Sequence, residues 1–585
     1  MANMSALYIG LSGLTNSSNA LNTTANNMAN VNTKGYVRQQ VVFEDTQYNV
    51  LNRFATAALQ RGNGVTIQQV SHVRDILLDE AYRRENGRYG FYDKLTNATD
   101  EIQTQLGELN GISYQNSISD LLAAINEVAK APDDNTARAA LVQSAISFLD
   151  RSQSIYKGLV SYQDSLNTEI ANMVDRINWI GDRIQYLNGQ ISVIESGVET
   201  AMTLRDERDL LLDELSGYVK IDYSEDANHV VTVMMEGNFF CDGLSVSHLG
   251  LNTIDGTSFY VPVWSEMKDT PLYNMELTMS TSKNTDIGSL KGLLAARGTI
   301  SPTYANMTPP AQVVTQKPDR ADYGSDEDYN AAVAAYTAYR DYQSFMSCKD
   351  YSVMARSIAN FDKMVNNIVE QINNVFSPMK DATVTYVDGN GKTVTYTGKV
   401  LDMDKTDYGK DANKTPGTEL FSRKYTDRYK EVTGTDGQTY YIYNTQNESG
   451  MDSIYTIANI EVLYDFSVLP LSQKDGKVDY DRAKELTALF SQKSMFYREG
   501  SESLTFEQFY EALVDDVGSE GKVYESMVAN QDDLSSGLDN GRQEVMGVSS
   551  DEELTNMVRY QQAYNAASRY INVITTMMDT VIQMI

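Results

Sequence analysis

Both ends of the chain repeat apolar residues at alternating steps of three and four positions. Near the N-terminus the repeat comprises Met4, Leu7, Leu11, Leu14, Leu21 and Met28. At the C-terminus it comprises Met557, Tyr560, Tyr564, Ile571, Ile574, Met578, Val581 and Ile585. This spacing places the apolar side chains in one stripe along a helix of the coiled-coil type. Because a single helix is marginally stable in water, we expect the two terminal helices to pair with each other.

The stretch between the two ends alternates between helical and strand-like patterns. The longest helical stripe runs through 136–196, which gives a rod of about 90 Å if it is unbroken. Residues 205–215 form another predicted helix, whose charged residues are spaced for i,i+4 ion pairs. The period changes to two near Tyr218, which predicts strands over 219–235, and strand signals return over 382–465. Further helices are predicted near 327–345 and at 351–376, 479–492 and 505–545.

This order of elements predicts a mixed α+β protein with several domains. The first predicted part is a discontinuous terminal coiled-coil domain of 1–50 plus 546–585. The second is a long α-helical bundle or rod domain of 51–220 plus 288–298, 350–377 and 466–545. The third consists of three outer inserts, which are β-rich at 221–287, loop and helix at 299–349, and β-rich at 378–465.

The N-terminal helix is intrinsically weak, although its apolar stripe is regular. It is rich in asparagine and contains Gly10 and Gly13, all poor helix formers. We therefore expect it to be disordered in the free monomer and ordered in a complex. The terminal stripes either form an internal contact within one molecule or also pack against neighbouring copies. The second interpretation is favoured, because two narrow stripes bury little apolar area by themselves.

The charge balance narrows the classes of partner. The chain has 48 basic and 79 acidic residues, a net charge of −31. Nucleic acids and anionic membrane surfaces both attract cationic proteins, so we expect neither as a partner. We also expect no membrane insertion and no cleaved secretory signal, since no run of 18 apolar residues occurs and the first basic residue is Lys34. Cys241 and Cys348 are either two thiols or a single disulfide.

Catalytic signals are sparse. His72, His229 and His248 are scattered along the chain, which argues against a histidine-centred metal site. A run of aspartates resembles calcium ligands, but it lacks the glycine and glutamate of a calcium-binding loop, so we interpret it as a solvated acidic loop. The run comprises Asp402, Asp404, Asp407 and Asp411. We expect no enzyme activity and no cofactor; the alternative is an enzyme carried in an insert, since two placed carboxylates suffice for polysaccharide hydrolysis.

Two sequence signatures flank the terminal stripes. The first includes Asn26, Asn27, Asn30, Asn32, Thr33, Gly35, Tyr36, Arg38 and Gln39. The second includes Gly547, Asp551, Glu552, Glu553, Leu554, Tyr560, Gln561, Gln562 and Tyr564. Together they resemble the signatures of the flagellar rod, hook and hook-associated axial proteins, and Arg74-Asp75 and the stretch Leu204 to Leu215 agree with the hook-associated branch. Lys34 departs from the pattern, which usually has proline before the glycine.

The resemblance implies a structural subunit without enzyme activity at the distal end of the hook, where it forms the hook-filament junction. The implied partners are the hook protein below, the second junction protein above, copies of itself in a ring or tube, and an export chaperone at the C-terminal helix. It also implies export through the flagellar type III apparatus. The alternative within the same family is another axial protein, such as a hook subunit or a flagellin-like protein.

Overall fold

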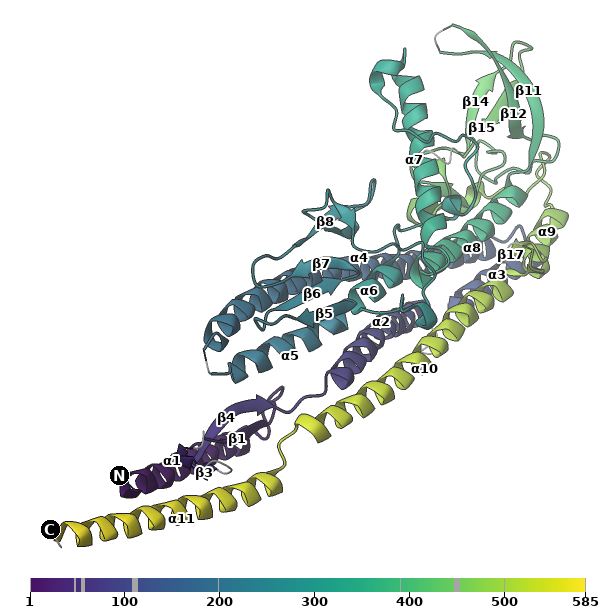
Figure 1. Ribbon diagram of the computed structural model, residues 1–585. Coiled ribbons are helices and arrows are strands. Elements are labelled where there is room, and N and C mark those ends of the chain that lie inside the picture. Colours follow the sequence, from purple (N-terminus) through teal and green to yellow (C-terminus); the bar gives the residue numbers. More distant parts are fainter. Residues whose placement is uncertain are drawn as a thin grey trace.

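The computed structural model describes residues 2–46, 49–53, 58–107, 114–197, 199–389, 391–446, 453–498 and 500–583. The molecule is elongated, with both chain ends at the same extremity (Figure 1). Its helices are α1 (Ala2–Ala29), α2 (Ile76–Leu106), α3 (Tyr114–Lys130), α4 (Asn135–Glu195), α5 (Met202–Tyr218), α6 (Ser289–Arg297), α7 (Asp326–Cys348), α8 (Val353–Phe376), α9 (Tyr480–Ser491), α10 (Phe506–Met546) and α11 (Ser550–Gln583).

The strands form small sheets in which every pairing is antiparallel. Near the N-terminus β1 (Gln39–Asp45) pairs with β4 (Val65–His72), and β2 (Asn49–Arg53) pairs with β3 (Ala58–Arg61). The first insert holds β5 (Ile221–Glu225), β6 (Val231–Met235), β7 (Asn238–Cys241), β8 (Leu249–Thr253), β9 (Tyr260–Trp264) and β10 (Thr270–Pro271). The later strands are β11 (Met379–Val387), β12 (Thr393–Leu401), β13 (Phe421–Arg423), β14 (Tyr429–Thr433), β15 (Thr439–Tyr443), β16 (Ile460–Val462), β17 (Met495–Phe496) and β18 (Ser503–Leu504). These sheets confirm the α+β fold class.

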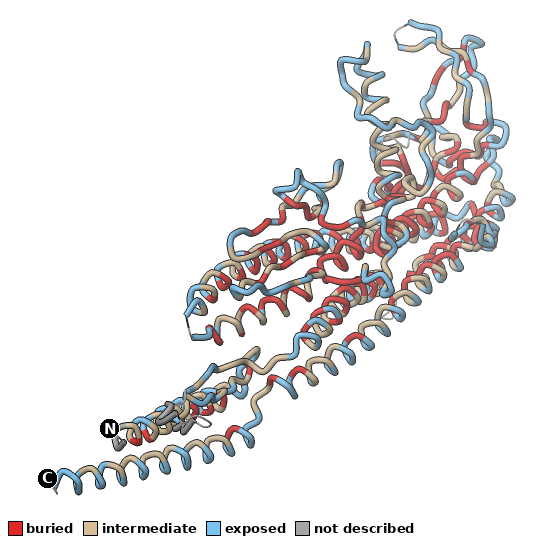
Figure 2. Tube along the Cα trace, in the orientation of Figure 1, coloured by how far each residue is buried: buried red, intermediate tan, exposed pale blue. Residues whose placement is uncertain are grey.

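Helix α4 is the backbone of the rod, and its 61 residues confirm the unbroken helix expected from the sequence. The side chain of Asp134 caps its first turn by accepting a hydrogen bond from the amide of Thr136. Its apolar stripe is buried along the whole helix, first against α3 and α8 and then against α5, α6 and the first insert. Figure 2 shows that buried residues are concentrated in the rod, where they alternate with partly buried ones along the helices.

Helix α10 closes the opposite side of the rod. Thr505 and Gln508 form a capping box at its start, and the helix then packs along α2. Phe509, Tyr510 and Leu513 are fully buried in its first half, whereas its second half lies mostly exposed. The rod therefore narrows toward the chain ends (Figure 1).

The candidate chemical residues of the sequence are dispersed in the structure. Cys241 and Cys348 are free, buried thiols, so the disulfide alternative is wrong. The acidic run is only partly solvated, because Asp402 and Asp407 are buried; Asp402 forms an ion pair with Lys380, 3.0 Å from its Nζ. No group of three or more potential metal ligands occurs among the described residues. Within the same residues, no helix is both long and apolar enough to cross a bilayer.

Candidate assembly interface

Helices α1 and α11 lie side by side and run in opposite directions (Figure 1). Gly10 and Gly13 make this approach close. A methyl group built on Gly10 would lie 2.7 Å from Cγ1 of Ile571, and one built on Gly13 would lie 3.5 Å from Cβ of Ala567. A larger side chain at position 10 has no room, so the two glycines that weaken α1 as an isolated helix allow α11 to pack against it.

The buried side of α1 differs from the side expected from the apolar stripe. Its buried residues are Ala6, Gly10, Ala20, Thr24 and Asn27. The expected stripe lies one residue later along the chain and is rotated to the flank, where Leu7, Leu14, Leu21 and Met28 are half-buried and Leu11 is 52% exposed. The small residues face inward because they allow a closer approach, and this preference overrides the larger apolar area of the leucines. Met4 lies within α1.

In α11 the expected stripe is turned toward α1. Its half-buried members are Met557, Tyr560, Tyr564, Ile571, Ile574 and Met578. Val581 is exposed, and Ile585 lies outside the described residues. A second side of α11 is also partly apolar, with Val573 and Met577 57% and 56% exposed. The helix thus has one side occupied by α1 and a second side open to a partner.

The asparagines of α1 attach it to the β1–β4 ribbon. Asn27 binds the backbone of Gln39 in both directions: its Nδ2 donates to the carbonyl at 2.9 Å, and its Oδ1 accepts from the amide at 3.1 Å. The same Oδ1 accepts from the Tyr36 hydroxyl at 2.8 Å, and Asn16 donates to the carbonyl of Val65. These bonds offset the poor helix propensity of asparagine. Helix propensity alone missed them, although regularly spaced asparagines on a helix are a detectable signal.

Lys34 fits the turn that ends the N-terminal signature. The amide of Tyr36 donates to the carbonyl of Thr33 at 3.2 Å, and Gly35 has a φ of +79°. In such a turn the second position favours proline but accepts other residues, whereas the third requires a positive φ. Lysine therefore preserves the turn, and Gly35 supplies the conformation that the turn requires.

The two signatures meet at a joint between the terminal helices and the rod. Arg38 forms ion pairs of 2.9 Å with Glu552 and with Glu553, and its amide donates to the carbonyl of Met546 at 2.9 Å. Arg38 and Glu553 are 515 residues apart in the sequence. Glu553 is only 2% exposed, so the pair is largely shielded from solvent. Ser549 completes the joint, since its hydroxyl accepts from the amide of Glu552 at the start of α11.

A buried carboxyl group connects the same joint to α5. Asp206 accepts a hydrogen bond from the amide of Val37 and lies 3.5 Å from Nε2 of His72. Burial raises the pKa of Asp206 to about 7, and burial together with Arg74 lowers the pKa of His72 to about 4. Burial and the nearby carboxylates of Asp206 and Glu553 raise the pKa of Tyr36 to about 12. The joint is therefore a compact site that holds titratable groups from three separate parts of the chain.

An ionic network holds the base of the rod together next to this joint. Arg542 of α10 binds Asp79 of α2 and Asp213 of α5, each at 2.7 Å, and Arg83 binds Asp213 at 2.7 Å. The Arg542 side chain is 3% exposed, and its guanidinium lies 4.3 Å from the ring centre of Tyr82. The network ties three helices that are far apart in the sequence.

The expectation of i,i+4 ion pairs within 205–215 is wrong. The charged side chains of α5 reach other elements instead: Glu207 binds Arg183 at 2.6 Å, and Glu214 binds Arg176 at 2.8 Å, both on α4. Arg205 binds Glu195 at the end of α4. Because α5 packs between α2 and α4, its charges serve contacts between helices rather than the helix itself.

Three family models match separate parts of the chain. The model of the flagellar hook-associated protein FlgK helical domain matches residues 99–320, that of the flagellar basal body rod FlgEFG protein C-terminal matches 539–584, and that of the flagella basal body rod protein matches 7–36. The sequence is 25% identical over 570 residues to flagellar hook-associated protein 1 of Bacillus subtilis (strain 168), covering 96% of this chain and 94% of that protein. The chain belongs to the flagellar hook-associated protein 1 family.

Other relatives in the family are similar over nearly the whole chain. Flagellar hook-associated protein 1 of Salmonella typhimurium is 24% identical, and that of Escherichia coli (strain K12) is 22% identical, each with 98% of both chains covered. The solved flagellar hook junction protein FlgK from Burkholderia pseudomallei is 13% identical with a TM-score of 0.44, covering 80% of this chain and all of that one. The two rod-protein models, at 7–36 and 539–584, cover most of α1 and all of α11, the two helices that the joint connects to the rod.

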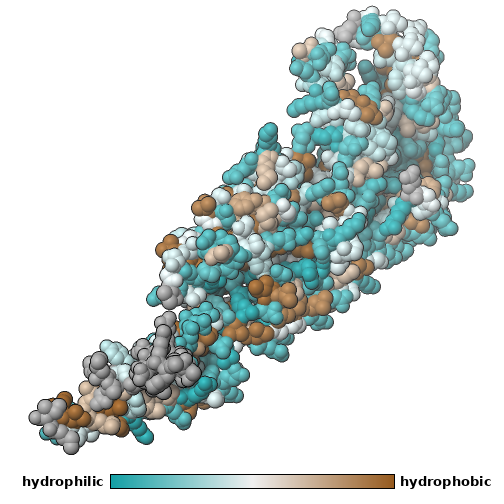
Figure 3. Space-filling view, in the orientation of Figure 1, coloured by the Kyte–Doolittle hydropathy of each residue, from teal (hydrophilic) through white to brown (hydrophobic). Residues whose placement is uncertain are grey.

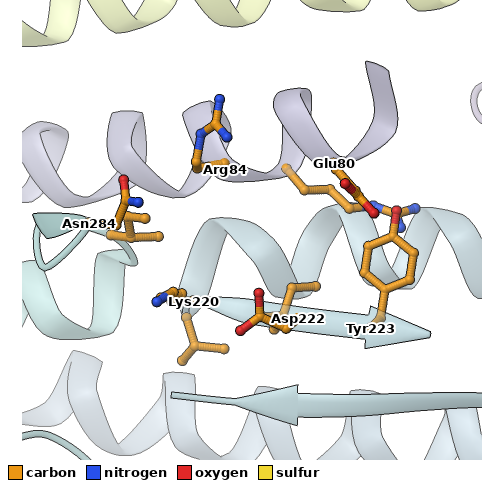
Figure 4. A pocket seen from close by; sticks show the side chains of 10 residues that line it. Glu80, Arg84, Lys220, Asp222, Tyr223 and Asn284 are labelled. Atoms are coloured by element: carbon orange, nitrogen blue, oxygen red, sulfur yellow. The ribbon is translucent and has the colours of Figure 1, made fainter. Parts of the chain in front are cut away.

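A polar pocket of about 330 Å³ lies between α2 and β5. Figure 4 shows its lining, in which Glu80 and Asp222 alternate with Arg84 and Lys220, beside Tyr223. Both carboxylates are exposed, so they lack the burial that prepares a carboxyl group for general acid catalysis. The arrangement offers a charged surface rather than a prepared reaction site.

Proposed function

We propose that this chain is a structural adaptor subunit of the bacterial flagellum, which assembles at the distal end of the hook and forms the hook-filament junction through its terminal helices. The observation that carries the proposal is the joint, where the two family signatures bind each other through Arg38 and Glu553. The joint presents α1 and α11 as one extension at the end of the rod, away from the inserts (Figure 1).

The terminal helix pair is suited to association with copies of itself. Apolar side chains are visible at the end of the molecule that holds α1 and α11 (Figure 3). Helix α1 contains no charged residue, so it can approach another copy without repulsion, although each chain carries a net charge of −31. Burying the free side of α11 contributes about 25 cal/mol for each Å² of apolar surface. Ordering of the termini is therefore coupled to assembly.

The remaining partners and the domain division follow from the family and the sequence. We propose the hook protein below, the second junction protein above, copies of this chain in a ring or tube, an export chaperone at the C-terminal helix, and export through the flagellar type III apparatus. The terminal pair is the inner domain, the helical rod surrounds it, and the inserts at 221–287, 299–349 and 378–465 project outward. The function is structural, without catalysis.

Deletion of 546–585 tests the proposal. The truncated chain keeps the rod network of Arg542, so we expect a folded, soluble protein. Its far-ultraviolet circular dichroism should equal that of the full chain less the contribution of α11. It should be absent from isolated hook-filament junctions, and the cells should lose motility. A chain lacking a surface segment of an insert, such as 436–437 at the β14–β15 turn, serves as the matched control. Normal junctions built from the truncated chain would refute the proposal.

A further inference from the structure

Helices α10 and α11 are separated by a break of three residues, Gly547 to Ser549. Figure 1 shows that α11 runs on toward the same end of the molecule as α10 but is displaced to one side of it. Within the described structure, the amides from Val548 to Asp551 donate no hydrogen bond to another protein group. In an uninterrupted helix each of them would donate to the carbonyl four residues earlier. The break therefore loses helical hydrogen bonds, which contacts with other elements must offset.

The local sequence does not require this break. No proline occurs in 506–583, and α10 contains four glycines without interruption. The apolar pattern also keeps its phase from one helix to the next. At about 100° per residue, Met557 and Tyr564 of the α11 stripe lie within about 20° of Met546, a buried residue of α10. In a continuous helix the buried side of α10 would thus pass directly into the stripe of α11, so the same sequence is compatible with one helix or with two.

The joint binds the backbone groups that the break sets free. The carbonyl of Met546 accepts from the amide of Arg38 at 2.9 Å, whereas in a continuous helix it would accept from the amide of Ser550. The amide of Glu552 donates to the hydroxyl of Ser549, whereas in a continuous helix it would donate to a backbone carbonyl. The joint and a continuous helix therefore compete for the same groups.

Gly547 is the residue that makes the broken conformation possible. A methyl group built on it would collide with the carbonyl oxygen of Gln543, to which the amide of Gly547 itself donates at 2.8 Å. The regular α-helix accommodates a methyl group at every position, and alanine is its best former. A side chain at position 547 would therefore disfavour the break and favour the continuous helix.

We infer that the break is a conformational switch set by the N-terminal segment. When α1 is not paired with α11, helices α10 and α11 form one continuous helix from Phe506 to Gln583, about 117 Å long. Docking of Arg38 at Met546 opens this helix at Gly547 and places α11 beside α1. The observation that carries the inference is that the amide of Arg38 takes the position of a helical hydrogen-bond donor.

The switch rests on the proposed function, because assembly is the step that orders α1. Before that step α11 projects from the rod as the end of α10, a single helix whose apolar stripe is uncovered. After it, α11 lies along α1 and the two form the terminal pair. Substitutions that weaken the joint alone leave α1 in place, so α11 stays beside it. The terminal pair therefore forms only after the N-terminal segment has docked.

Hydrogen exchange of the unassembled full-length chain tests the switch. Gly547→Ala strains the break and favours the helix, so the amides from Val548 to Asp551 should gain at least about tenfold protection. Gly537→Ala on α10 is the matched control, because a methyl group there has no neighbour within 4 Å and the break is unaffected. Both are made in a Gly10→Leu chain, in which overpacking loosens α1 from α11. Unprotected amides in a folded Gly547→Ala chain would overturn the switch.

A proline at the start of α11 tests the switch in the opposite direction. Ser550→Pro fits the break, because the amide of Ser550 has no hydrogen-bond partner in the described structure and proline is favoured at the first position of a helix. It does not fit a continuous helix, since its ring would clash with the carbonyl of Met546. Added to Gly547→Ala, it should return the exchange of the neighbouring amides to within about twofold of the control.

The two proposals fail in different experiments. Protection that persists after Ser550→Pro is added would overturn the switch, because a helix interrupted at that position cannot produce it. This result comes from the unassembled chain and does not depend on the junction. Incorporation of the chain lacking 546–585 into junctions would instead refute the proposed function.

Discussion

The ion pairs of Arg38 permit a quantitative test, because one of its partners is buried and the other is exposed. The side chain of Glu553 is 3% exposed, that of Glu552 is 61% exposed, and both lie 2.9 Å from the Arg38 guanidinium. Removing the arginine from a buried pair typically costs 3–5 kcal/mol. Since Arg38 is 25% exposed, solvent screens part of this, and we expect Arg38→Ala to destabilise the joint by about 2–3 kcal/mol.

The matched pair of glutamates provides the control. Glu553→Gln should cost about 1–2 kcal/mol, whereas Glu552→Gln should cost less than about 0.5 kcal/mol, as for a surface ion pair. The double variant Arg38→Ala with Glu553→Gln should be less destabilised than the sum of the single variants. The measurement is native-state hydrogen exchange of the amides at the start of α11, which reports local opening. Equal costs for Glu552→Gln and Glu553→Gln would refute the argument from burial.

Three further changes have expected outcomes. Gly10→Leu overpacks the contact between α1 and α11, so it should destabilise that contact by about 1–3 kcal/mol and raise the hydrogen-exchange rate of α11. Gly189→Ala on α4, where a methyl group has no neighbour within 4 Å, should instead stabilise the rod by about 0.5–1 kcal/mol in thermal unfolding. Arg542→Met leaves two carboxylates close together and should lower the thermal stability of the rod by about 3 kcal/mol or more, while Lys522→Met on the exposed side should change it little. Burial raises the pKa of Asp206, so the contribution of this carboxyl group to folding stability is greatest below pH 4 and declines until about pH 7. The folding stability of Asp206→Asn relative to the natural chain should therefore increase over this range, by on the order of 2 kcal/mol in denaturant titrations. A variant that is more stable than the natural chain at acid pH instead would contradict this sign.

The elements of the rod could be predicted because their patterns are long and regular. The stripe of α4 repeats over many turns, and the capping residues Asp134 and Thr505 mark the starts of α4 and α10. Most residues of the α11 stripe are half-buried, whereas their role in assembly stays a prediction. Each such pattern depends only on the residues of one helix and on which of its faces is buried. A single sequence therefore carries enough information to locate these helices.

The contacts between elements could not be predicted in the same way. The inward side of α1 depends on how closely Gly10 lets α11 approach, which the apolar pattern of α1 does not contain. The charges of α5 have the spacing of local ion pairs, yet Glu207 and Glu214 bind arginines of α4. Packing brings these arginines closer to the two glutamates than the basic residues of α5 itself. The joint between Arg38 and Glu553 was visible only as two separate signatures.

The positions of these contacts imply an order in which the terminal pair forms. Closing a loop of 515 residues between Arg38 and Glu553 is entropically costly in an unfolded chain. The rod removes most of that cost, since Arg542 is anchored on Asp79 and Asp213 and fixes the end of α10 beside the joint. The carbonyl of Met546 then accepts a hydrogen bond from the Arg38 amide, and α11 can pack along α1. The terminal pair therefore depends on the rod, whereas the rod does not depend on the pair, which is why a chain ending at 545 should stay folded and yet fail to assemble.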